Sequence, residues 1–466
     1  MSVAEATRLI GQRRRLHFMG IGGAGMCALA EILLDRGLVV TGCDLRPGAA
    51  APHLTALGAQ IHTGHSPDHL HPDDGVVVSS AIQAQEPEVV AARERGHPIV
   101  RRAEMLGALM TGSPGIAVAG THGKSTTTAM IGAVLEAAGW DPTVMVGGRM
   151  RDRGGNVRIG RGEWLVAEAD EFDRSFLALS PRHAVVTNVE VDHLDTYGTP
   201  QAYRAAFAEF VGQVTAGGVV VVGADDPGAR SLPISDGIRR TTFGLGEHAD
   251  VRATDLLDGE MESRFTLVLA GEPAGEVVLG LPGRHNVRNA LAAAAIGWAL
   301  DVDPGAIRDG LTRVRGIERR FEIVRTGVDL TIIDDYAHHP TEVEAALATA
   351  RRSFPGRRLV AVFQPHLYSR TRDLAEEFGR SLAAADVVFV MPIYPAREAP
   401  IPGVTAELVS RAARAAGAAE VIDLGEADEA RLVAARLAPG DVVVTMGAGD
   451  IDLLAPRLAA QTEEGR

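Results

Sequence analysis

The sequence predicts an α/β protein of three domains: an N-terminal Rossmann-like domain, a central P-loop ATPase-like sheet with antiparallel additions, and a C-terminal Rossmann-like domain. Short β-branched runs alternate with helical patterns along nearly the whole chain, which favours parallel sheets covered by helices. Two glycine-rich turns, at residues 20–25 and 120–125, each follow a predicted strand and open a predicted helix. The chain has 466 residues, enough for about three domains with sizeable cores.

The first domain is expected at residues 1–107. A strand at 16–19 leads through the first glycine turn into a helix near 26–36. Apolar residues in that helix recur at i, i+3, i+4 and i+7, as on one buried helix face. A second strand at 38–43 is followed directly by Asp44. The segment therefore has the order of a βαβ unit.

The second domain is expected at residues 108–316, after the turn-rich segment TGSPG. Short strands alternate with Gly and Asp turns between residues 241 and 282, and we interpret them as antiparallel hairpins added to the sheet edge. The other elements expected here are strands at 164–167, 184–187 and 219–222 and a helix over 287–300.

The third domain is expected at residues 317–466, where the alternation of strands and helices begins again. We expect a doubly wound sheet there. Its strands are expected at 330–333, 359–363, 387–390, 420–422 and 442–445.

The charge balance argues against a partner with a strongly acidic surface. The chain has 46 basic and 60 acidic residues, a formal net charge of −14, whereas binders of nucleic acids or membrane surfaces need a basic footprint. Of the 46 cations only one is a lysine, Lys124, so 45 are arginines. A single retained ammonium group draws attention to that position.

The cysteines and the first residues favour a cytoplasmic protein. Cys27 and Cys43 have no CxxC spacing and form no framework for disulfides, which is typical of a reducing compartment. The first fifteen residues lack the apolar stretch of a secretory signal. The longest apolar run, 290–300, is shorter than the ~20 residues that span a bilayer.

The first glycine turn, GIGGAG, has Gly20, Gly22 and Gly25 in G-x-G-x-x-G register. Such glycines let a pyrophosphate approach a helix N-terminus, and a carboxylate at the next strand end, here Asp44, can bind a ribose hydroxyl. The alternative is a turn that only packs the helix on the strand. The motif by itself does not separate NAD from a UDP-sugar.

The second turn, GTHGKST, is a shortened P-loop that lacks the first glycine of the usual G-x-x-x-x-G-K-[ST] pattern. The shortened turn can still bind phosphates, because the backbone amides at a helix start surround them. Lys124 is placed to reach the β- and γ-phosphates, and Ser125 to ligate Mg²⁺. The alternative is an ordinary capped helix, but an arginine could not replace so compact a cation in a tight loop.

Polar residues follow two more strands of the second domain. Glu168 and three further carboxylates, Asp170, Glu171 and Asp173, lie where ligands bind in open α/β sheets, and at least one is expected to hold Mg²⁺. His193 follows the next strand in TNVEVDHLD. The alternatives are a solvated acidic loop and an ordinary loop histidine.

Two motifs follow strands of the third domain, DDYAHHP and QPHLYSRTRD. Arg370 and Arg372 could bind a carboxylate or phosphate in bidentate fashion, although most arginines in this chain are expected at the surface. A histidine-rich segment precedes residue 72, and its irregular Pro/Asp/Gly-rich setting indicates a solvated loop rather than a metal site. Its histidines are His53, His62, His65, His69 and His71.

The motifs together resemble the Mur ligases, the ATP-dependent amide-bond ligases of peptidoglycan synthesis, and their ordered series covers nearly the whole chain. The segments that carry the resemblance are HFMGIGGAGM, VVVSSAI, RRAEMLGALM, GTHGKSTTTAM, VAEADEFDRSFL, TNVEVDHLDTY, GRHNVRNALAA, GIERRFE, DDYAHHPTE, FQPHLYSRTRDL and TMGAGDI.

The resemblance implies a set of site residues, position by position. Sugar-nucleotide contacts are implied for Gly20, Gly22, Gly23, Gly25, Asp44, Ser79 and Ser80. ATP contacts are implied for Gly120, Thr121, His122, Gly123, Lys124, Ser125, Thr126, Asn286, Arg320 and Asp335. Two Mg²⁺ ions are implied, one on Ser125 and Glu168 and the other on His193, and the catalytic residues would be Lys124, His193, His338 and Arg370.

The chain departs from the family pattern at two points. Relatives often have arginine directly after the histidine of FQPH, where this chain has Leu367, so a second arginine for the substrate carboxylate is in doubt. Several relatives have a carbamylated lysine at the metal site. This chain cannot, because its single lysine lies in the phosphate loop.

The reaction implied is ATP-dependent ligation of L-alanine to UDP-N-acetylmuramate through an acyl phosphate, in a cytoplasmic monomer or weak homodimer whose domains close over the site. Within the family the alternative is a ligase that recycles the tripeptide, whose acidic segment usually differs from EFDRSFLALSP. Outside it the alternatives are an NAD-dependent oxidoreductase, which leaves GTHGKST unexplained, and a P-loop regulator or transport ATPase, which leaves the flanking domains unexplained.

Overall fold

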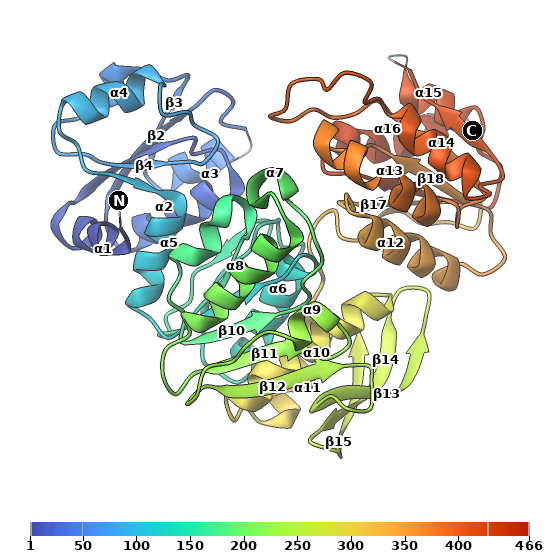
Figure 1. Cartoon of the computed structure of the whole chain (residues 1–466), viewed down its shortest axis with the longest axis horizontal. Helices are drawn as coiled ribbons and strands as arrows, with labels where there is room; N and C mark the ends of the chain where they lie inside the picture. Colours follow the sequence, from blue (N-terminus) through green and yellow to red (C-terminus); the bar gives the residue numbers. More distant parts are fainter. Residues whose placement is uncertain (1, 49, 426–427, 465–466) are drawn as a thin grey trace. The chain divides into compact units, whose positions relative to one another are not determined.

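The computed structural model describes residues 2–48, 50–425 and 428–464. These described residues form two compact units, of which unit 1 lies within the ranges 1–254, 266–277 and 288–315, and unit 2 within the ranges 255–265, 278–287 and 316–466. Figure 1 colours the chain along its sequence and labels its elements. The expected α/β class with three sheet-containing domains is confirmed, and the expected boundary residues stay predictions.

The first sheet has the strand order β3-β2-β1-β4-β5, and all its neighbours are parallel. The order reverses between β1 and β4, a position at which open α/β sheets bind ligands at the carboxyl ends of their strands. Its strands are β1 Arg15–Met19, β2 Val39–Asp44, β3 Gln60–Thr63, β4 Gly75–Val78 and β5 Ile99–Arg101. Its helices are α1 Val3–Gln12, α2 Ala24–Asp35, α3 Ala50–Ala56, η1 Pro67–His69, α4 Pro87–Glu94 and α5 Arg102–Thr111.

The second sheet has ten strands in the order β15-β14-β13-β12-β11-β10-β6-β9-β7-β8. Its strands are β6 Gly115–Ala119, β7 Thr143–Met145, β8 Val157–Arg158, β9 Leu165–Glu168, β10 His183–Val186, β11 Val219–Gly223, β12 Arg239–Gly244, β13 Val251–Asp258, β14 Ser263–Leu269 and β15 Glu272–Leu279. Its helices are α6 Lys124–Ala137, η2 Phe172–Ala178, α7 Leu194–Tyr197, α8 Pro200–Gly212, α9 Pro227–Arg230, α10 Arg284–Ala299 and α11 Pro304–Arg313.

One part of the hairpin prediction is wrong. Strand β12 pairs in parallel with both β11 and β13, so the region expected to hold only antiparallel hairpins begins with a parallel strand. The loop between β12 and β13 is closed by Asp250, whose Oδ2 accepts hydrogen bonds from the Thr242 amide at 2.8 Å and its hydroxyl at 2.7 Å. These bonds join the two ends of the loop between β12 and β13. The alternation of strands and turns in the sequence does not reveal the parallel direction of β12.

The first two sheets share a hydrophobic core within unit 1. Helix α5 contributes Met105 and Leu109, which belong to the same buried cluster as Phe176 and Phe210 of the second sheet's helices. Gly107 lies so close to the Ala178 carbonyl that a Cβ there would collide with it. The first two sheets are therefore packed as one unit.

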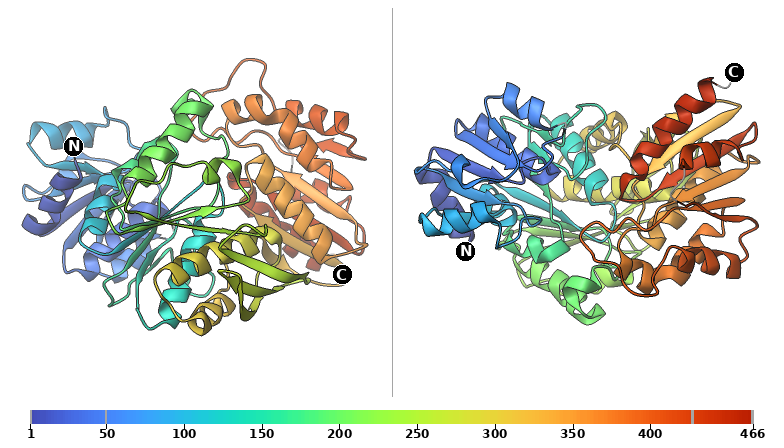
Figure 2. Two further views of the ribbon diagram at one scale, coloured as in Figure 1. Left: turned by 60° about the horizontal axis from the view of Figure 1, so that its bottom comes forward. Right: turned by 90° about the horizontal axis from the view of Figure 1, so that it is seen from above.

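The third sheet has the order β16-β17-β21-β18-β19-β20, with β16 antiparallel to β17 and the other described pairs parallel. Helices cover both of its faces (Figure 2), and each face has its own buried apolar cluster. Its strands are β16 Glu322–Arg325, β17 Leu330–Asp335, β18 Leu359–Phe363, β19 Val387–Val390, β20 Val421–Asp423 and β21 Asp441–Met446. Its helices are α12 Pro340–Ser353, α13 Tyr368–Leu382, α14 Glu407–Ala415, α15 Glu429–Ala434, η3 Asp450–Leu453 and α16 Leu454–Glu464.

Within the described ranges, no helix combines the length and the apolar character needed to cross a membrane.

Candidate functional site

The first glycine turn connects β1 to α2 at the switch point of the first sheet. Gly20 has φ +81°, and a Cβ there would lie 2.9 Å from Ser79 Cβ. Gly23 is the N-cap of α2, and a Cβ on Gly25 would lie 2.9 Å from Arg102 Nη1. The glycines therefore meet a steric requirement, because a side chain at Gly20 or Gly25 would collide with Ser79 or Arg102.

Asp44, at the end of β2, holds this turn in place. Its Oδ2 accepts a hydrogen bond from the Gly22 amide at 2.9 Å, and its Oδ1 accepts one from the Arg46 amide at 2.8 Å. Ser79 accepts a weak bond from the Ala81 amide at 3.3 Å, and Ser80 is exposed. The structure thus brings Asp44 and Ser79 to the glycine turn, whereas their contacts to a ligand stay predictions.

The second glycine turn connects β6 to α6 and is likewise set by close approach. Gly120 and Gly123 have φ +138° and +81°, and a Cβ on them would collide with Thr187 and with Asn289 respectively. Thr187 donates its hydroxyl to the His122 carbonyl at 2.6 Å. The turn is therefore held by the end of β10, and its amides lie at the N-terminus of a helix of 14 residues.

Lys124 is the first residue of α6, and its side chain folds back over the turn. The ammonium Nζ donates to the Gly120 carbonyl at 2.6 Å and to the Thr121 carbonyl at 3.2 Å. It also contacts both oxygens of Glu171, at 3.0 and 2.8 Å. The side chains of Lys124 and Glu171 are only 16% and 2% exposed, so they form a buried ion pair.

The electrostatics of this pair follow from burial and from the carboxylates around it. Burial opposes the charge of Lys124, but Glu171, Asp170 and Glu168 outweigh it and raise the lysine pKa above its usual value. Burial raises the pKa of Glu171 to about 7, although Lys124 opposes the shift. The sequence offered four candidate carboxylates here, and only the structure selects Glu171 as the partner of the lysine.

His193 lies beside the same carboxylate. Its Nε2 is 3.7 Å from Glu171 Oε1 and 3.8 Å from Asp192 Oδ2, and its ring is tilted against Phe172 at 5.5 Å. Its backbone is left-handed, with φ +52°, at the N-cap of α7. Lys124, Glu171 and His193 therefore form one cluster at the carboxyl edge of the second sheet.

Ser125 and Glu168 are the oxygen donors expected for a metal. Ser125 is buried in the first turn of α6, next to Lys124. Glu168 ends β9 and accepts a hydrogen bond from the Gly147 amide. It is also one of the carboxylates that raise the pKa of Lys124. Hydroxyl and carboxylate oxygens are the donors that Mg²⁺ prefers, so the chemistry of these residues fits that ion.

Unit 2 has its own polar cluster at the carboxyl end of β17. Buried Asp335 accepts hydrogen bonds from the Phe321 and Ala337 amides, both at 2.8 Å. Burial raises the pKa of Asp335 to about 7, opposed by Arg320. Arg320 lies over the Tyr336 ring at 5.0 Å and 3.4 Å from Glu342 Oε1. Asp335 and Arg320 thus lie close enough to interact electrostatically, whereas their contacts to ATP stay predictions.

His366 lies near both His338 and Arg370. The His338 and His366 rings are 6.2 Å apart, and Arg370 Nη1 lies 3.3 Å from His366 Nδ1. Arg370 is 6% exposed, while Leu367, where relatives often have arginine, is buried with φ +71°. His366 was missed as a candidate, although the motif FQPH contains it. Asn286, which also belongs to unit 2, donates to the Pro282 carbonyl at 2.8 Å.

The prediction of a solvated histidine loop is wrong for two of its members. The side chains of His65 and His69 are only 5% and 16% exposed, and both contact the buried carboxylate of Glu88. His53 and His71 are about half exposed, as expected. The error arose because the spacing of these residues does not reveal that they pack against the first sheet.

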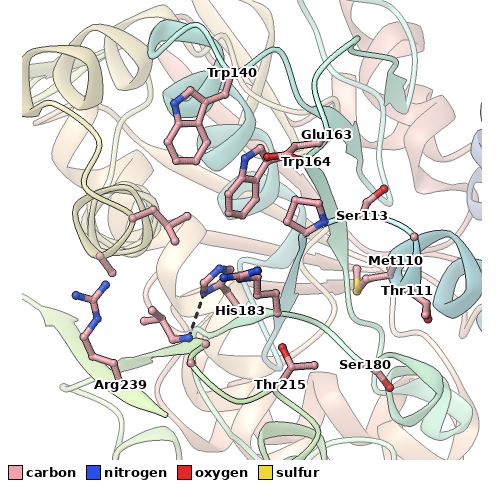
Figure 3. Close-up of a pocket in the computed structure, with 18 of the residues that line it drawn as sticks. Met110, Thr111, Ser113, Trp140, Glu163, Trp164, Ser180, His183, Thr215 and Arg239 are labelled. Atoms are coloured by element: carbon pink, nitrogen blue, oxygen red, sulfur yellow. Dashed lines mark hydrogen bonds between the residues drawn. The ribbon is translucent and has the colours of Figure 1, made fainter. Parts of the chain in front are cut away.

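The pocket in Figure 3 lies at the opposite edge of the second sheet, with a volume of about 830 Å³. Its lining includes Trp164 and His183, which stand at the amino ends of β9 and β10. His183 Nδ1 accepts a hydrogen bond from the Val219 amide at 3.1 Å, and burial lowers the pKa of His183 to about 4. Open α/β sheets bind ligands at their carboxyl edges, whereas this pocket lies at the amino edge.

Comparison with known proteins gives matches over almost the whole chain. Three family models match: "Mur ligase family, catalytic domain" at residues 15–113, "Mur ligase middle domain" at 118–297 and "Mur ligase, glutamate ligase domain" at 319–449. A UDP-N-acetylmuramate–L-alanine ligase of Chlorobaculum tepidum is 47% identical over 98% of this chain and 97% of its own length. The ligase of that name from Laribacter hongkongensis is also 47% identical, over 96% of this chain and 97% of its own.

Solved structures of ligases also match this chain over nearly its whole length. The crystal structure of UDP-N-acetylmuramate–alanine ligase from Thermotoga maritima matches with a TM-score of 0.81 and 30% identity, over 97% of this chain and all of that chain. A murein peptide ligase from Psychrobacter arcticus matches with a TM-score of 0.70 and 25% identity, over 96% of this chain and 98% of its own.

Proposed function

This chain belongs to the Mur ligase family, and on that basis we propose that it joins L-alanine to the lactyl carboxylate of UDP-N-acetylmuramate, with conversion of ATP to ADP and phosphate. The substrates are taken from the names of relatives that are 47% identical over nearly the full chain. In the structure, the observation that carries the proposal is the single lysine, which lies within a glycine turn at a helix N-terminus.

In the first step we expect the lactyl carboxylate to attack the γ-phosphorus of ATP, forming an acyl phosphate and releasing ADP. Two anions must meet, so catalysis needs positive charge that is fixed in advance. The amides at the start of α6 and the ammonium of Lys124 supply it. Lys124 now donates to Gly120, Thr121 and Glu171, and a phosphate oxygen would replace one of these acceptors.

In the second step the neutral amine of L-alanine attacks the carbonyl carbon of the acyl phosphate, and phosphate leaves from the tetrahedral intermediate. Water would hydrolyse the acyl phosphate, so the site must exclude it. The roles assigned to His338, Arg370, Arg320, Asp335 and Asn286 stay predictions from the family resemblance.

Ser125 and Glu168 would hold one Mg²⁺, and His193 with Glu171 would hold a second. When bound, these ions neutralise charge on the phosphoryl oxygens. Glu171 is included because His193 Nε2 lies 3.7 Å from it. As a buried carboxylate beside Lys124, it also offers negative charge at this site without a carbamylated lysine.

The turn at Gly20–Gly25 would bind the pyrophosphate of the sugar nucleotide at the N-terminus of α2. The open position at Gly23, the N-cap of α2, supports this, since a Cβ there would meet no atom closer than 3.6 Å. We also propose a cytoplasmic location, supported by the two free thiols Cys27 and Cys43. A monomer or weak homodimer stays a prediction.

The decisive experiment measures phosphate release from ATP with UDP-N-acetylmuramate and a panel of amino acids and peptides. We expect turnover with L-alanine and no turnover when the sugar nucleotide is omitted. Preference for a tripeptide would instead favour the recycling ligase, since a murein peptide ligase is among the similar structures. ATP hydrolysis that is independent of the sugar nucleotide would contradict the ligase proposal.

A further inference from the structure

A cluster of four metal-binding side chains lies on the α4 side of the first sheet, separate from the residues assigned above. It contains His17 of β1, Cys43 of β2, His69 of η1 and Glu88 of α4. One ligand atom from each residue lies within 4.8 Å of the other three. These residues are far apart in sequence and come together through the fold.

The cluster is buried within an apolar layer. His17 and Glu88 are fully buried, and the His69 side chain is 16% exposed. Their neighbours on this face include Met19, Val76 and Val89. Ionisable groups in such a layer are costly unless their charges and polar atoms are compensated.

Three polar atoms of the cluster contact one another but make no well-aligned hydrogen bond to any residue that the structure describes. They are His17 Nε2, His69 Nδ1 and Glu88 Oε1, and all three are buried. Both imidazole nitrogens point at the same carboxylate oxygen, from 3.0 and 3.3 Å. Two imidazole nitrogens thus converge on one buried carboxylate oxygen without well-aligned hydrogen bonds, and such an arrangement of buried polar atoms needs an explanation.

The surrounding hydrogen bonds orient these atoms inward. His17 Nδ1 lies 2.8 Å from Thr41 Oγ1, which leaves Nε2 directed at the cluster. The Ser66 amide donates to the other oxygen of Glu88 at 3.2 Å. Outer hydrogen bonds that fix a ligand's ring orientation or carboxylate are typical of protein metal sites.

We propose that His17, Cys43, His69 and Glu88 bind one Zn²⁺ ion. Two imidazole nitrogens, a thiolate and a carboxylate form a mixed nitrogen, sulfur and oxygen set, which suits tetrahedral zinc and not the all-oxygen sites of Mg²⁺ or Ca²⁺. With metal–ligand bonds of ~2.0–2.3 Å, the ligand atoms of a tetrahedron lie roughly 3.3–3.8 Å apart. The cluster needs only small side-chain movements to reach that spacing.

Zinc would take the place of the thiol proton that now joins Cys43 to Glu88. Without a metal, the Cys43 thiol donates to Glu88 Oε2 at 3.1 Å. On binding, the thiol loses its proton to solvent and the sulfur coordinates the ion, as zinc thiolates require. The exposed ring of His62 stacks on His69 at 4.3 Å, so the ion would enter from that side.

The test uses the full chain after treatment with a chelator, with Co²⁺ and Zn²⁺ as probes and excess Mg²⁺ present to saturate oxygen sites. Tetrahedral Co²⁺ with a thiolate ligand gives visible absorption bands and a sulfur-to-metal band in the near ultraviolet. We expect one Co²⁺ per chain with both features and displacement by Zn²⁺. We also expect Zn²⁺ to raise the midpoint of thermal unfolding.

The variants separate this site from adventitious binding. Cys43→Ser should lose the sulfur-to-metal band, and His69→Gln, near the surface, should bind at least tenfold more weakly. Two controls should behave as the parent: Cys27→Ser, which removes the other free thiol, and His53→Gln, which removes an exposed histidine. Binding that is absent in the parent, or equal in the parent and both cluster variants, would overturn the proposal.

Discussion

Replacement of Lys124 by methionine should destabilise unit 1 by an amount that depends on pH. Lys124 is paired with a carboxylate that is only 2% exposed, and the pair is surrounded by further acidic groups. Breaking a buried pair costs about 3–5 kcal/mol when the remaining charge stays ionised. Glu171 can avoid part of that cost by keeping its proton.

The sign follows from the pKa of Glu171, which is raised to about 7 in the folded parent protein. Above the unfolded pKa and below the folded pKa, the folded chain holds a proton that the unfolded chain has lost, so stability falls as pH rises. In the parent this fall ends near pH 7. Without Lys124 the folded pKa is higher still, so the loss continues at about 1.4 kcal/mol per pH unit.

At pH 6 the variant should therefore lose mainly the hydrogen bonds of Lys124 to the Gly120 and Thr121 carbonyls, about 1–2 kcal/mol. At pH 8.5 the loss should be about 2 kcal/mol greater. The assay is urea unfolding followed by tryptophan fluorescence, which reports on unit 1 because Trp140, Trp164 and Trp298 all belong to it.

The matched control is the double variant Lys124→Met with Glu171→Gln, which removes the titrating group and should remove the extra loss at high pH. Equal destabilisation at pH 6 and pH 8.5 would refute the reasoning. So would a double variant that keeps the pH dependence of the single variant.

Further predictions concern single positions. Lys124→Arg should lose at least ~100-fold in turnover while far-ultraviolet circular dichroism stays unchanged, because a planar guanidinium does not fit the turn; near-normal phosphate release would contradict the phosphate-loop assignment. His193→Ala should lose activity that excess Mg²⁺ partly restores, and an unchanged Mg²⁺ dependence would remove it from the metal site. Because the pKa of His183 is lowered to about 4, the unfolded chain binds an extra proton between pH 4 and 6.5, so stability should rise with pH there by about 3 kcal/mol. His183→Gln should flatten that rise in urea unfolding. Gly123→Ala should cost about 2 kcal/mol, because φ is +81° and a Cβ would collide with Asn289; a neutral effect would contradict the turn geometry.

The strands of the third sheet illustrate what local pattern can predict. Strands β18 and β19 begin and end at the expected residues, since runs such as LVAVF are apolar on both faces and are bounded by polar residues. The two glycine turns were located for a similar reason, because their signals lie within a few residues of each other.

Features that depend on distant pairing were not predicted. The parallel direction of β12 depends on its neighbours in the sheet. The choice of Glu171 among four carboxylates depends on the irregular segment around η2, in which Asp173 and Arg174 have positive φ. His69 and Glu88 meet because η1 and α4 pack on the same face of the first sheet, and no sequence spacing reveals that contact.

The core shared by the first two sheets has a consequence for the two glycine turns. Arg102, at the start of α5, lies 3.4 Å from Asp170, and Asn156 donates to the Ala24 carbonyl at the start of α2. With Gly107 packed on Ala178, these contacts join the segments that carry the two glycine turns within unit 1. The separation between the two turns therefore depends on how the first two sheets pack against each other.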